Sequence, residues 1–370
     1  MANEFDVFVV GGGPAGLAAA IAARKRGLEV VVADGSEPPI DKACGEGLLP
    51  ATLHALKRLD VRLDSCDGYP FYGIRFADHQ SAVEAYFPRL RALGVRRTTL
   101  HARMLESARN YGVQFLWRTE VTRLLDHAVV ARNRIIRTGW IVGADGANSR
   151  VRQWVGLNPY SFYLRRYGFR QHYRLRPWSD CVEVYWEDRA QIYVTPVGDS
   201  EICLACVSMS PSTRVADVLS AFPDLRARLV GAVPTSSERG AVTAMHRLRR
   251  VYRENVALIG DASGGVDAIT GDGICLSFQQ AFALASALKD NDLSFYQKAH
   301  RRLSRVPTFL GFHLLSMDGR PWLRRRALSA LAANPQLFGR FLSAHIGEAS
   351  LWDCVKAGAV LGMRLLSSSA

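Results

Sequence analysis

The stretch DVFVVGGGPAGLAAAIAARKRGLEVVVAD, from Asp6 to Asp34, constrains the fold more than any other part of the chain. It contains a short apolar strand, a glycine turn, an alanine-rich helix and a second strand with an acidic end. Gly11, Gly13 and Gly16 give the spacing GxGxxG at the strand-to-helix turn. In this context the spacing is typical of a dinucleotide-binding βαβ unit.

Each part of this unit has a physical role. Gly11 permits the tight turn, Gly13 lets a pyrophosphate approach the backbone, and Gly16 lets the helix pack closely on the strand. The helix N-terminus offers N–H groups and a positive dipole end to phosphates. Asp34 is placed to accept hydrogen bonds from ribose hydroxyls. The predicted phosphate-binding turn comprises Gly11, Gly13, Pro14, Ala15 and Gly16.

Length and composition set the class of protein. The chain has 370 residues, of which 48% are hydrophobic and 22% charged, which suits one large domain or two intertwined ones. No apolar run reaches the length of about 18 residues that a membrane span needs. The chain enters a strand almost at once, so we expect no secretory or transit peptide and a cytoplasmic location.

Neither the cysteines nor the charge suggests a metal site or nucleic-acid binding. The seven cysteines form no disulfide framework, and the lone Cys203-x-x-Cys206 pair has no histidine beside it. We therefore interpret that pair as two thiols on an apolar strand and expect no metal. The net charge of +13 comes from basic residues that are spread out, without a recognisable nucleic-acid module. An acidic cofactor or an anionic membrane surface explains the excess as well.

The remaining pattern predicts an α/β fold with α+β insertions: a discontinuous Rossmann-like domain, an antiparallel-sheet substrate domain and a helical C-terminal part. Three strands about ten residues apart follow residue 180, and a strand, a glycine-rich loop and a helix follow residue 255. We expect the nucleotide-binding domain at 1–66, 95–155 and 250–292, the substrate domain at 67–94 and 156–249, and the helical region at 293–370.

Three separated motifs together resemble the para-hydroxybenzoate hydroxylase superfamily of FAD enzymes. They are GGGPAG at 11–16, GADGANSRVR at 143–152 and LIGDASGGVDAITGDGI at 258–274. The resemblance implies that FAD is the cofactor and that NAD(P)H is a transient co-substrate, since a second GxGxxG is absent from the sequence.

The resemblance also assigns cofactor contacts beyond the first motif. Asp261 would hold a ribityl hydroxyl, and the amides of the following turn would face the pyrimidine edge of the flavin and stabilise its negative charge when reduced. Arg97, before a predicted helix, matches an arginine that contacts the cofactor. The assigned positions are Asp34, Arg97, Val121, Asp145, Asp261, Gly271, Gly273 and Ile274.

Within this superfamily the chain resembles the geranylgeranyl reductase branch. It shares the second-loop motif, here CGEGL at 44–48, which would place Cys44, Gly45 and Gly47 near the flavin ring. It departs from that branch at IYVTPVG, 192–198, where the tryptophan of the YxWxFP strand is missing. The WxWxIP stretch of flavin halogenases is also absent from the sequence.

Because these motifs describe how flavin is held, they do not separate the possible reactions. Our first choice is an NAD(P)H-consuming monooxygenase that hydroxylates a hydrophobic phenolic or polyketide-type ring with O2, through a flavin hydroperoxide. The alternative is a geranylgeranyl reductase-like enzyme that reduces isoprenoid double bonds. A halogenase ranks third.

Substrate contacts are expected from the antiparallel sheet, at Tyr185, Tyr193 and Thr195, of which alternation lets only about half face the flavin. His172 is a candidate acid or base, but we interpret it in preference as a surface histidine, and no catalytic residue is assigned. The basic stretch PWLRRRALSALAANPQLFGRFLSAHIG near the C-terminus could rest on an anionic membrane and receive a lipophilic substrate.

Overall fold

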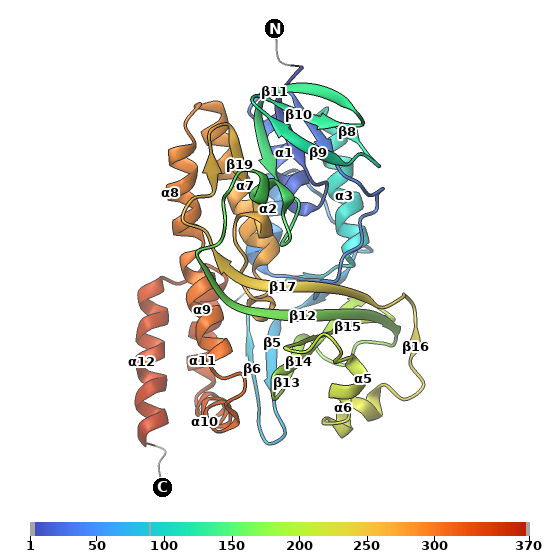
Figure 1. Cartoon of the computed structure of the whole chain (residues 1–370). Helices are drawn as coiled ribbons and strands as arrows, with labels where there is room; N and C mark the ends of the chain where they lie inside the picture. Colours follow the sequence, from blue (N-terminus) through green and yellow to red (C-terminus); the bar gives the residue numbers. More distant parts are fainter. Residues whose placement is uncertain (1–3, 89, 368–370) are drawn as a thin grey trace.

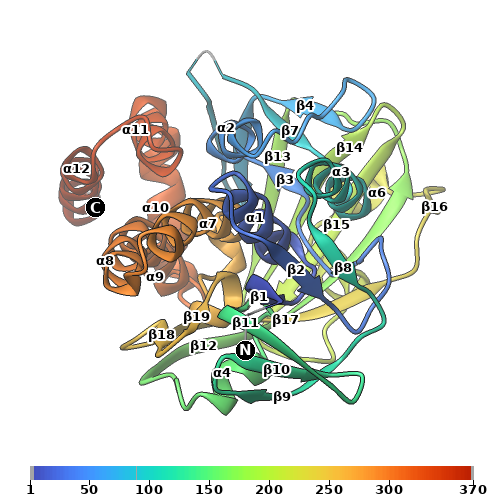
Figure 2. The ribbon, with the colours of Figure 1, turned by 90° about the horizontal axis from the view of Figure 1, so that it is seen from above.

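A computed structural model describes residues 4–88 and 90–367. Two large sheets dominate the molecule: one lies in the upper half of Figure 1 and the other crosses the lower half, with the C-terminal helices along one side. Figure 2 shows that α7, α8, α9, α11 and α12 gather on this same side.

The first sheet is built around the N-terminal βαβ unit. Its path runs β18-β19-β11-β1-β2-β8, with parallel pairing from β19 to β8, while β9 and β10 extend β11 as an antiparallel meander. Its strands are β1 (Phe5–Val10), β2 (Val30–Ala33), β8 (Gln114–Leu116), β9 (Val121–Leu125), β10 (Ala128–Ala131), β11 (Arg134–Gly143), β18 (Tyr252–Arg253) and β19 (Val256–Leu258).

Helices cover this sheet and form a hydrophobic core with its strands. The alanine-rich α1 is buried along most of its length, so that α3 and α7 pack closely against it. The elements on or beside this sheet are α1 (Pro14–Arg24), α2 (Pro50–Arg58), α3 (Arg97–Asn110), α4 (Arg150–Trp154), α7 (Gly273–Lys289), α8 (Leu293–Leu303) and the 3₁₀ turns η1 (Gly260–Ser263) and η2 (Ala268–Thr270).

The second sheet is mostly antiparallel and runs β16-β12-β15-β14-β13-β5-β6, with β17 paired to β12. Its strands are β5 (Gly73–Ala77), β6 (Ala82–Tyr86), β12 (Ser161–Arg174), β13 (Cys181–Glu187), β14 (Ala190–Gly198), β15 (Glu201–Ser208), β16 (Val233–Pro234) and β17 (Arg239–Arg247). A small third sheet contains β3 (Gly47–Leu48), β7 (Ala92–Gly94) and β4 (Tyr69–Phe71). Its strands occur where the chain passes from the first large sheet to the second and back again.

The two faces of the second sheet have different surroundings. On one face, Ile192, Val194 and Leu204 pack under α5 (Val215–Leu219) and α6 (Pro223–Arg228) in an apolar cluster. Because side chains alternate along a strand, Tyr193 and Thr195 point the other way, toward the first sheet. The second sheet therefore presents one face to its own small core and the other to the space between the sheets.

The C-terminal helices pack against β6 and η2, beside that space. They are α9 (Arg305–Ser316), α10 (Pro321–Ala332), α11 (Pro335–His345) and α12 (Leu351–Ser367). Phe338 of α11 packs on Phe76 of β5 with ring centroids 5.6 Å apart, and α10 and α11 both lie against β6. None of the helices within residues 4–88 and 90–367 is both long and apolar enough to cross a membrane.

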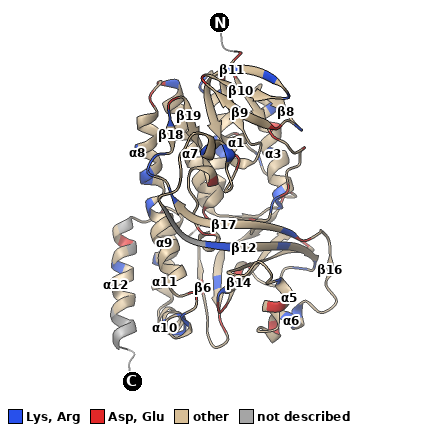
Figure 3. Ribbon diagram, in the orientation of Figure 1, with Lys and Arg blue, Asp and Glu red and all other residues tan. Residues whose placement is uncertain are grey.

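The fold class predicted from the sequence is confirmed: a Rossmann-like parallel sheet with α+β insertions and C-terminal helices. Lys and Arg lie on many elements in both halves of the molecule rather than along one stripe (Figure 3).

His300 of α8 makes the stability of this fold depend on pH. Its side chain is 8% exposed, with Nε2 2.9 Å from the Ser263 hydroxyl, and burial lowers its pKa to about 4. The unfolded chain takes up a proton near 6.5, so the free energy of unfolding falls as pH drops from about 6.5 to about 4. The difference in pKa corresponds to about 3 kcal/mol.

When the pH is lowered from about 7 to about 4.5, the free energy of unfolding should fall in both the wild type and His300→Gln. We expect the fall to be smaller in His300→Gln by about 2 kcal/mol. Denaturant titration of both proteins at the two pH values measures this. Equal losses in the two proteins would show that His300 is not responsible.

Candidate functional site

A cavity of about 590 Å³ lies between the two sheets, within the size range of small-molecule sites. It is lined by the first glycine turn, the 40–49 loop, the 144–150 segment and the 260–277 segment on one side. Strands β5, β13, β14 and β17 line it on the other side. Segments about 250 residues apart in the chain therefore share one chamber.

The three sequence motifs touch one another at glycines. A Cβ atom on Gly11 would lie 2.5 Å from the Ala144 carbonyl oxygen, which joins the first motif to the second. A Cβ on Gly260 would lie 2.8 Å from the Cβ of Ala15, which joins the first to the third. Such distances are shorter than side chains tolerate, so glycine is required for these approaches.

Nearly all of the predicted site residues line this cavity. They are Gly11, Gly13, Pro14, Ala15, Asp34, Cys44, Gly45, Gly47, Arg97, Val121, Asp145, Tyr193, Thr195, Asp261, Gly271, Gly273 and Ile274. Gly16 does not line it; a Cβ there would lie 1.9 Å from the Gly11 carbonyl oxygen, so its role is close packing. Tyr185 lies on the opposite face of the sheet, against Phe222 at a ring distance of 5.3 Å.

The three predicted carboxylates differ in the hydrogen bonds that they already make within the protein. Asp34 accepts the N–H groups of Gly12 and Ser36, both at 2.7 Å. Asp145 caps α4, since its oxygens accept from the Ser149 hydroxyl and the Arg150 N–H. Asp261 has about half of its side chain exposed and pairs only loosely with Lys42, at 3.4 Å. Asp261 is therefore the carboxylate best placed to accept a ligand hydroxyl.

The residues present fit FAD. A Cβ on Gly13 would meet nothing within 4 Å, and no side chain caps α1, so a pyrophosphate has access to the positive end of this helix. Arg97 lines the cavity and its buried Nε has no hydrogen-bond partner among the described residues. The first turn of α7, at Gly273 and Ile274, likewise directs its N-terminal end at the cavity.

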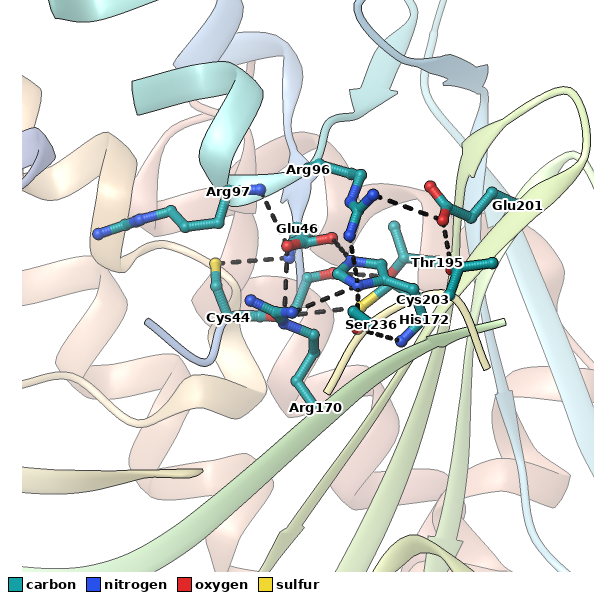
Figure 4. A network of polar contacts seen from close by, with 12 residues as sticks. Cys44, Glu46, Arg96, Arg97, Arg170, His172, Thr195, Glu201, Cys203 and Ser236 are labelled. Carbon is teal, nitrogen blue, oxygen red and sulfur yellow. Dashed lines mark hydrogen bonds and ion pairs between the residues drawn. The ribbon is translucent and has the colours of Figure 1, made fainter. Parts of the chain in front are cut away.

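Glu46 fastens the 41–48 loop to the start of α3 and to β12 of the second sheet. It is 2% exposed, accepts the Arg97 N–H at 2.9 Å, and lies 2.6 Å from Nε2 of His172 on β12. Arg170, also on β12, lies 3.6 Å from Glu46 (Figure 4). Arg170 also pairs with Asp41. The loop that carries Cys44 beside the cavity is thus held by a buried ionic network.

The network contacts both ring nitrogens of His172. Its Nδ1 lies 3.3 Å from guanidinium nitrogens of both Arg96 and Arg170, and these groups can only donate. The Ser236 hydroxyl also lies 2.8 Å from Nδ1, so Nδ1 is placed to accept, and Nε2 faces the Glu46 carboxylate. The interpretation of His172 as a surface residue was wrong, because it is 1% exposed. Hydrophobic pattern alone gives no signal for a buried polar cluster.

Glu46, His172 and Cys203 place their possible ligand atoms within 4.8 Å of one another, a spacing that metal ions use. Arg170 already supplies positive charge to Glu46, and burial raises the pKa of the Cys203 thiol well above its usual value. The Glu46 carboxylate already accepts the Arg97 N–H and lies 2.6 Å from Nε2 of His172, so two of the three candidate ligands bond to each other. The cluster is therefore better described as a hydrogen-bonded network.

Comparison with known proteins agrees with this geometry. A family model described as FAD binding domain matches residues 4–291. Menaquinone reductase of Mycolicibacterium smegmatis is 27% identical over 340 residues, covering 84% of this chain and 83% of that protein. Digeranylgeranylglycerophospholipid reductase 1 of Methanopyrus kandleri is 28% identical over 312 residues, covering 73% and 76%.

The solved structures include one of the same architecture. A geranylgeranyl bacteriochlorophyll reductase-like protein from Thermoplasma acidophilum matches with a TM-score of 0.76 at 18% identity, over 98% of each chain. At this identity the likeness supports the fold. It extends to the C-terminal helices, which lie beyond the region that the family model matches.

Proposed function

The chain belongs to the FAD binding domain family and is an FAD-dependent oxidoreductase, and on this premise we propose that it reduces a carbon–carbon double bond of a lipophilic isoprenoid substrate. The relatives named as a menaquinone reductase and a digeranylgeranylglycerophospholipid reductase support a reduction. The CGEGL loop, which the sequence shares with geranylgeranyl reductases, supports the same chemistry.

The observation that carries the proposal is the apolar wall of the cavity. Many of the side chains that the second sheet and its neighbours contribute there are hydrocarbon, namely Phe71, Ile74, Phe76, Val182 and Val184, beside the polar Tyr193, Thr195 and Thr243. Each CH₂ group buried on such a wall contributes about 0.8 kcal/mol. An isoprenoid chain is all hydrocarbon, so it matches this wall better than a small polar ring does.

The protein positions and shields the reacting groups. FAD, when bound, supplies the two-electron chemistry, and NAD(P)H is the proposed source of its electrons. The N-terminal end of α7 favours negative charge beside it. The loop at Cys44 and Gly45 is held at the cavity by the Thr195 hydroxyl, which donates to the Gly45 carbonyl at 2.7 Å. The apolar wall orients the substrate and excludes water.

We expect the protein purified with FAD to saturate geranylgeraniol when it is incubated with NAD(P)H without oxygen. Mass spectrometry should show a product heavier by two hydrogen atoms per reduced bond. Asp261→Ala is the control, because the loss of this carboxylate should reduce the FAD content and the product together.

The same experiment under isotopically labelled O2 tests for the competing reaction, hydroxylation. Hydroxylation, which we ranked first from the sequence, requires oxygen and places one labelled atom in the product. A product that carries that atom, with no saturation under anaerobic conditions, would replace the proposed reduction by oxygenation. Halogenation would instead require halide.

A further inference from the structure

Besides Nε of Arg97, two further polar atoms without a hydrogen-bond partner among the described residues belong to side chains in the cavity wall, beside its hydrocarbon surface. One is the hydroxyl of Tyr193 on β14, a residue that lines the cavity. This hydroxyl is buried and has no hydrogen-bond partner within residues 4–88 and 90–367. Burial raises the pKa of Tyr193 well above its ordinary value, so the group stays protonated and offers a hydrogen-bond donor.

The second atom belongs to Asp267, which precedes η2 and is 1% exposed. Its Oδ1 accepts from the Arg166 guanidinium at 2.8 Å and from the Ile269 N–H at 3.0 Å. Its Oδ2 is buried, and no described residue donates to it. The ion pair with Arg166 uses only Oδ1, so Oδ2 is left as an unused acceptor.

The surroundings hold Asp267 in place. Arg166 is fully buried, and its other bonds run to Gln191 and to the Val207 carbonyl, while Gln191 donates to Asp318 at 3.0 Å. Rotation of Asp267 toward Tyr193 would break its bonds to Arg166 and Ile269. Gln191 and Tyr193 are two residues apart on β14 and share a face, so the Arg166–Gln191 bond brings Asp267 to the same part of the wall as Tyr193. A donor and an acceptor are thus kept available in the same part of the cavity wall.

We propose that Tyr193 and Asp267 bind a hydroxyl group of the substrate, that of a lipophilic alcohol or phenol. A hydroxyl accepts from the Tyr193 O–H and donates to Asp267 Oδ2 at the same time, which satisfies both buried atoms. A carbonyl or ether oxygen satisfies only the first and leaves the carboxylate oxygen unpaired, which costs affinity. This inference rests on the proposed function in taking the cavity as the substrate site.

The test measures binding rather than turnover. Oxidised protein with FAD bound is titrated with geranylgeraniol and with its methyl ether, and the change in the visible spectrum gives each dissociation constant. A prenylated hydroquinone and its dimethyl ether form a second pair, which separates phenols from alcohols. We expect the free hydroxyl compound of at least one pair to bind about tenfold more tightly than its ether.

Variants assign the effect to the two residues. Tyr193→Phe should weaken binding of the preferred hydroxyl compound about tenfold, and Asp267→Asn should abolish its advantage over the ether. Tyr185→Phe is the matched control, because its hydroxyl bonds to Glu183 on the other face of the sheet, and it should change nothing. Since Asp267 also holds Arg166, Tyr193→Phe serves as the test should Asp267→Asn fail to fold.

Equal affinities for hydroxyl compound and ether in both pairs, no binding of any of them, or unchanged affinity in Tyr193→Phe would overturn the proposal. Failure of the proposed function gives a different result. A hydroxyl compound that binds selectively through Tyr193, but whose double bonds are not reduced, would leave this site in place and remove only the reaction.

Discussion

Gly16→Ala should abolish folding of the first sheet, whereas Gly13→Ala, three residues earlier, should leave the fold intact and weaken FAD binding. A Cβ on Gly16 would lie 1.9 Å from the Gly11 carbonyl oxygen and 3.3 Å from the Ala144 Cβ, both parts of the packed core. Overpacking costs about 1–3 kcal/mol where side chains can move, and more where backbone must move. We expect little or no soluble Gly16→Ala protein.

At Gly13 the same methyl group meets nothing within 4 Å of protein but occupies the approach of the pyrophosphate to α1. We expect an unfolding temperature without added FAD close to that of the wild type, and an affinity for FAD lower by about tenfold, or about 1.4 kcal/mol. Thermal unfolding and FAD titration, monitored by flavin fluorescence, measure both. If the two variants behaved alike, the roles assigned to these glycines would be wrong.

Glu46→Gln should lower the free energy of unfolding by about 3–5 kcal/mol, the cost of removing one partner from a buried ionic network. The substitution preserves size but removes the charge that Arg170 faces at 3.6 Å. It also places an amide near the Arg97 N–H that the carboxylate accepts and near Nε2 of His172. Denaturant titration at neutral pH measures the change.

Glu37→Gln is the matched control, because Glu37 pairs with Arg118 on the surface, where both side chains are more than half exposed. Exposed pairs contribute at most about 1 kcal/mol. A loss at Glu46 no larger than the loss at Glu37 would contradict the role of the buried network. Release of FAD from Glu46→Gln at lower denaturant concentration than the unfolding of the first sheet would show that the network acts on the cavity loop.

The backbone at Glu46 strengthens this expectation. Its φ is 60°, in the left-handed region where a residue with a side chain is disfavoured by about 1–2 kcal/mol. Glycine would relieve that strain, and the motif already contains glycine on both sides, at Gly45 and Gly47. The carboxylate therefore contributes interactions that outweigh the strained backbone.

The local parts of the cofactor site were predictable from the sequence. The turn at Gly11, Gly13 and Gly16, the strands around it and the motif at Asp261 each depend on residues within a few positions of one another. Hydrophobic period and glycine spacing act over that range, so a sequence pattern is sufficient. The resemblance of three such motifs then predicted one chamber, which the structure forms from them.

Tertiary structure alone decided which polar residues meet between the sheets. Glu46 and His172 are 126 positions apart, and Arg166 and Asp267 are 101 apart. Their pairing depends on how the second sheet docks on the first and on which face of each strand points inward. The same docking places Tyr193 at the cavity and Tyr185 on the opposite face. A local pattern shows that a strand alternates but not which face becomes buried against a distant segment. The sequence by itself therefore determined the cofactor class and the fold, and the docking of the two sheets determined the polar chemistry of the substrate side.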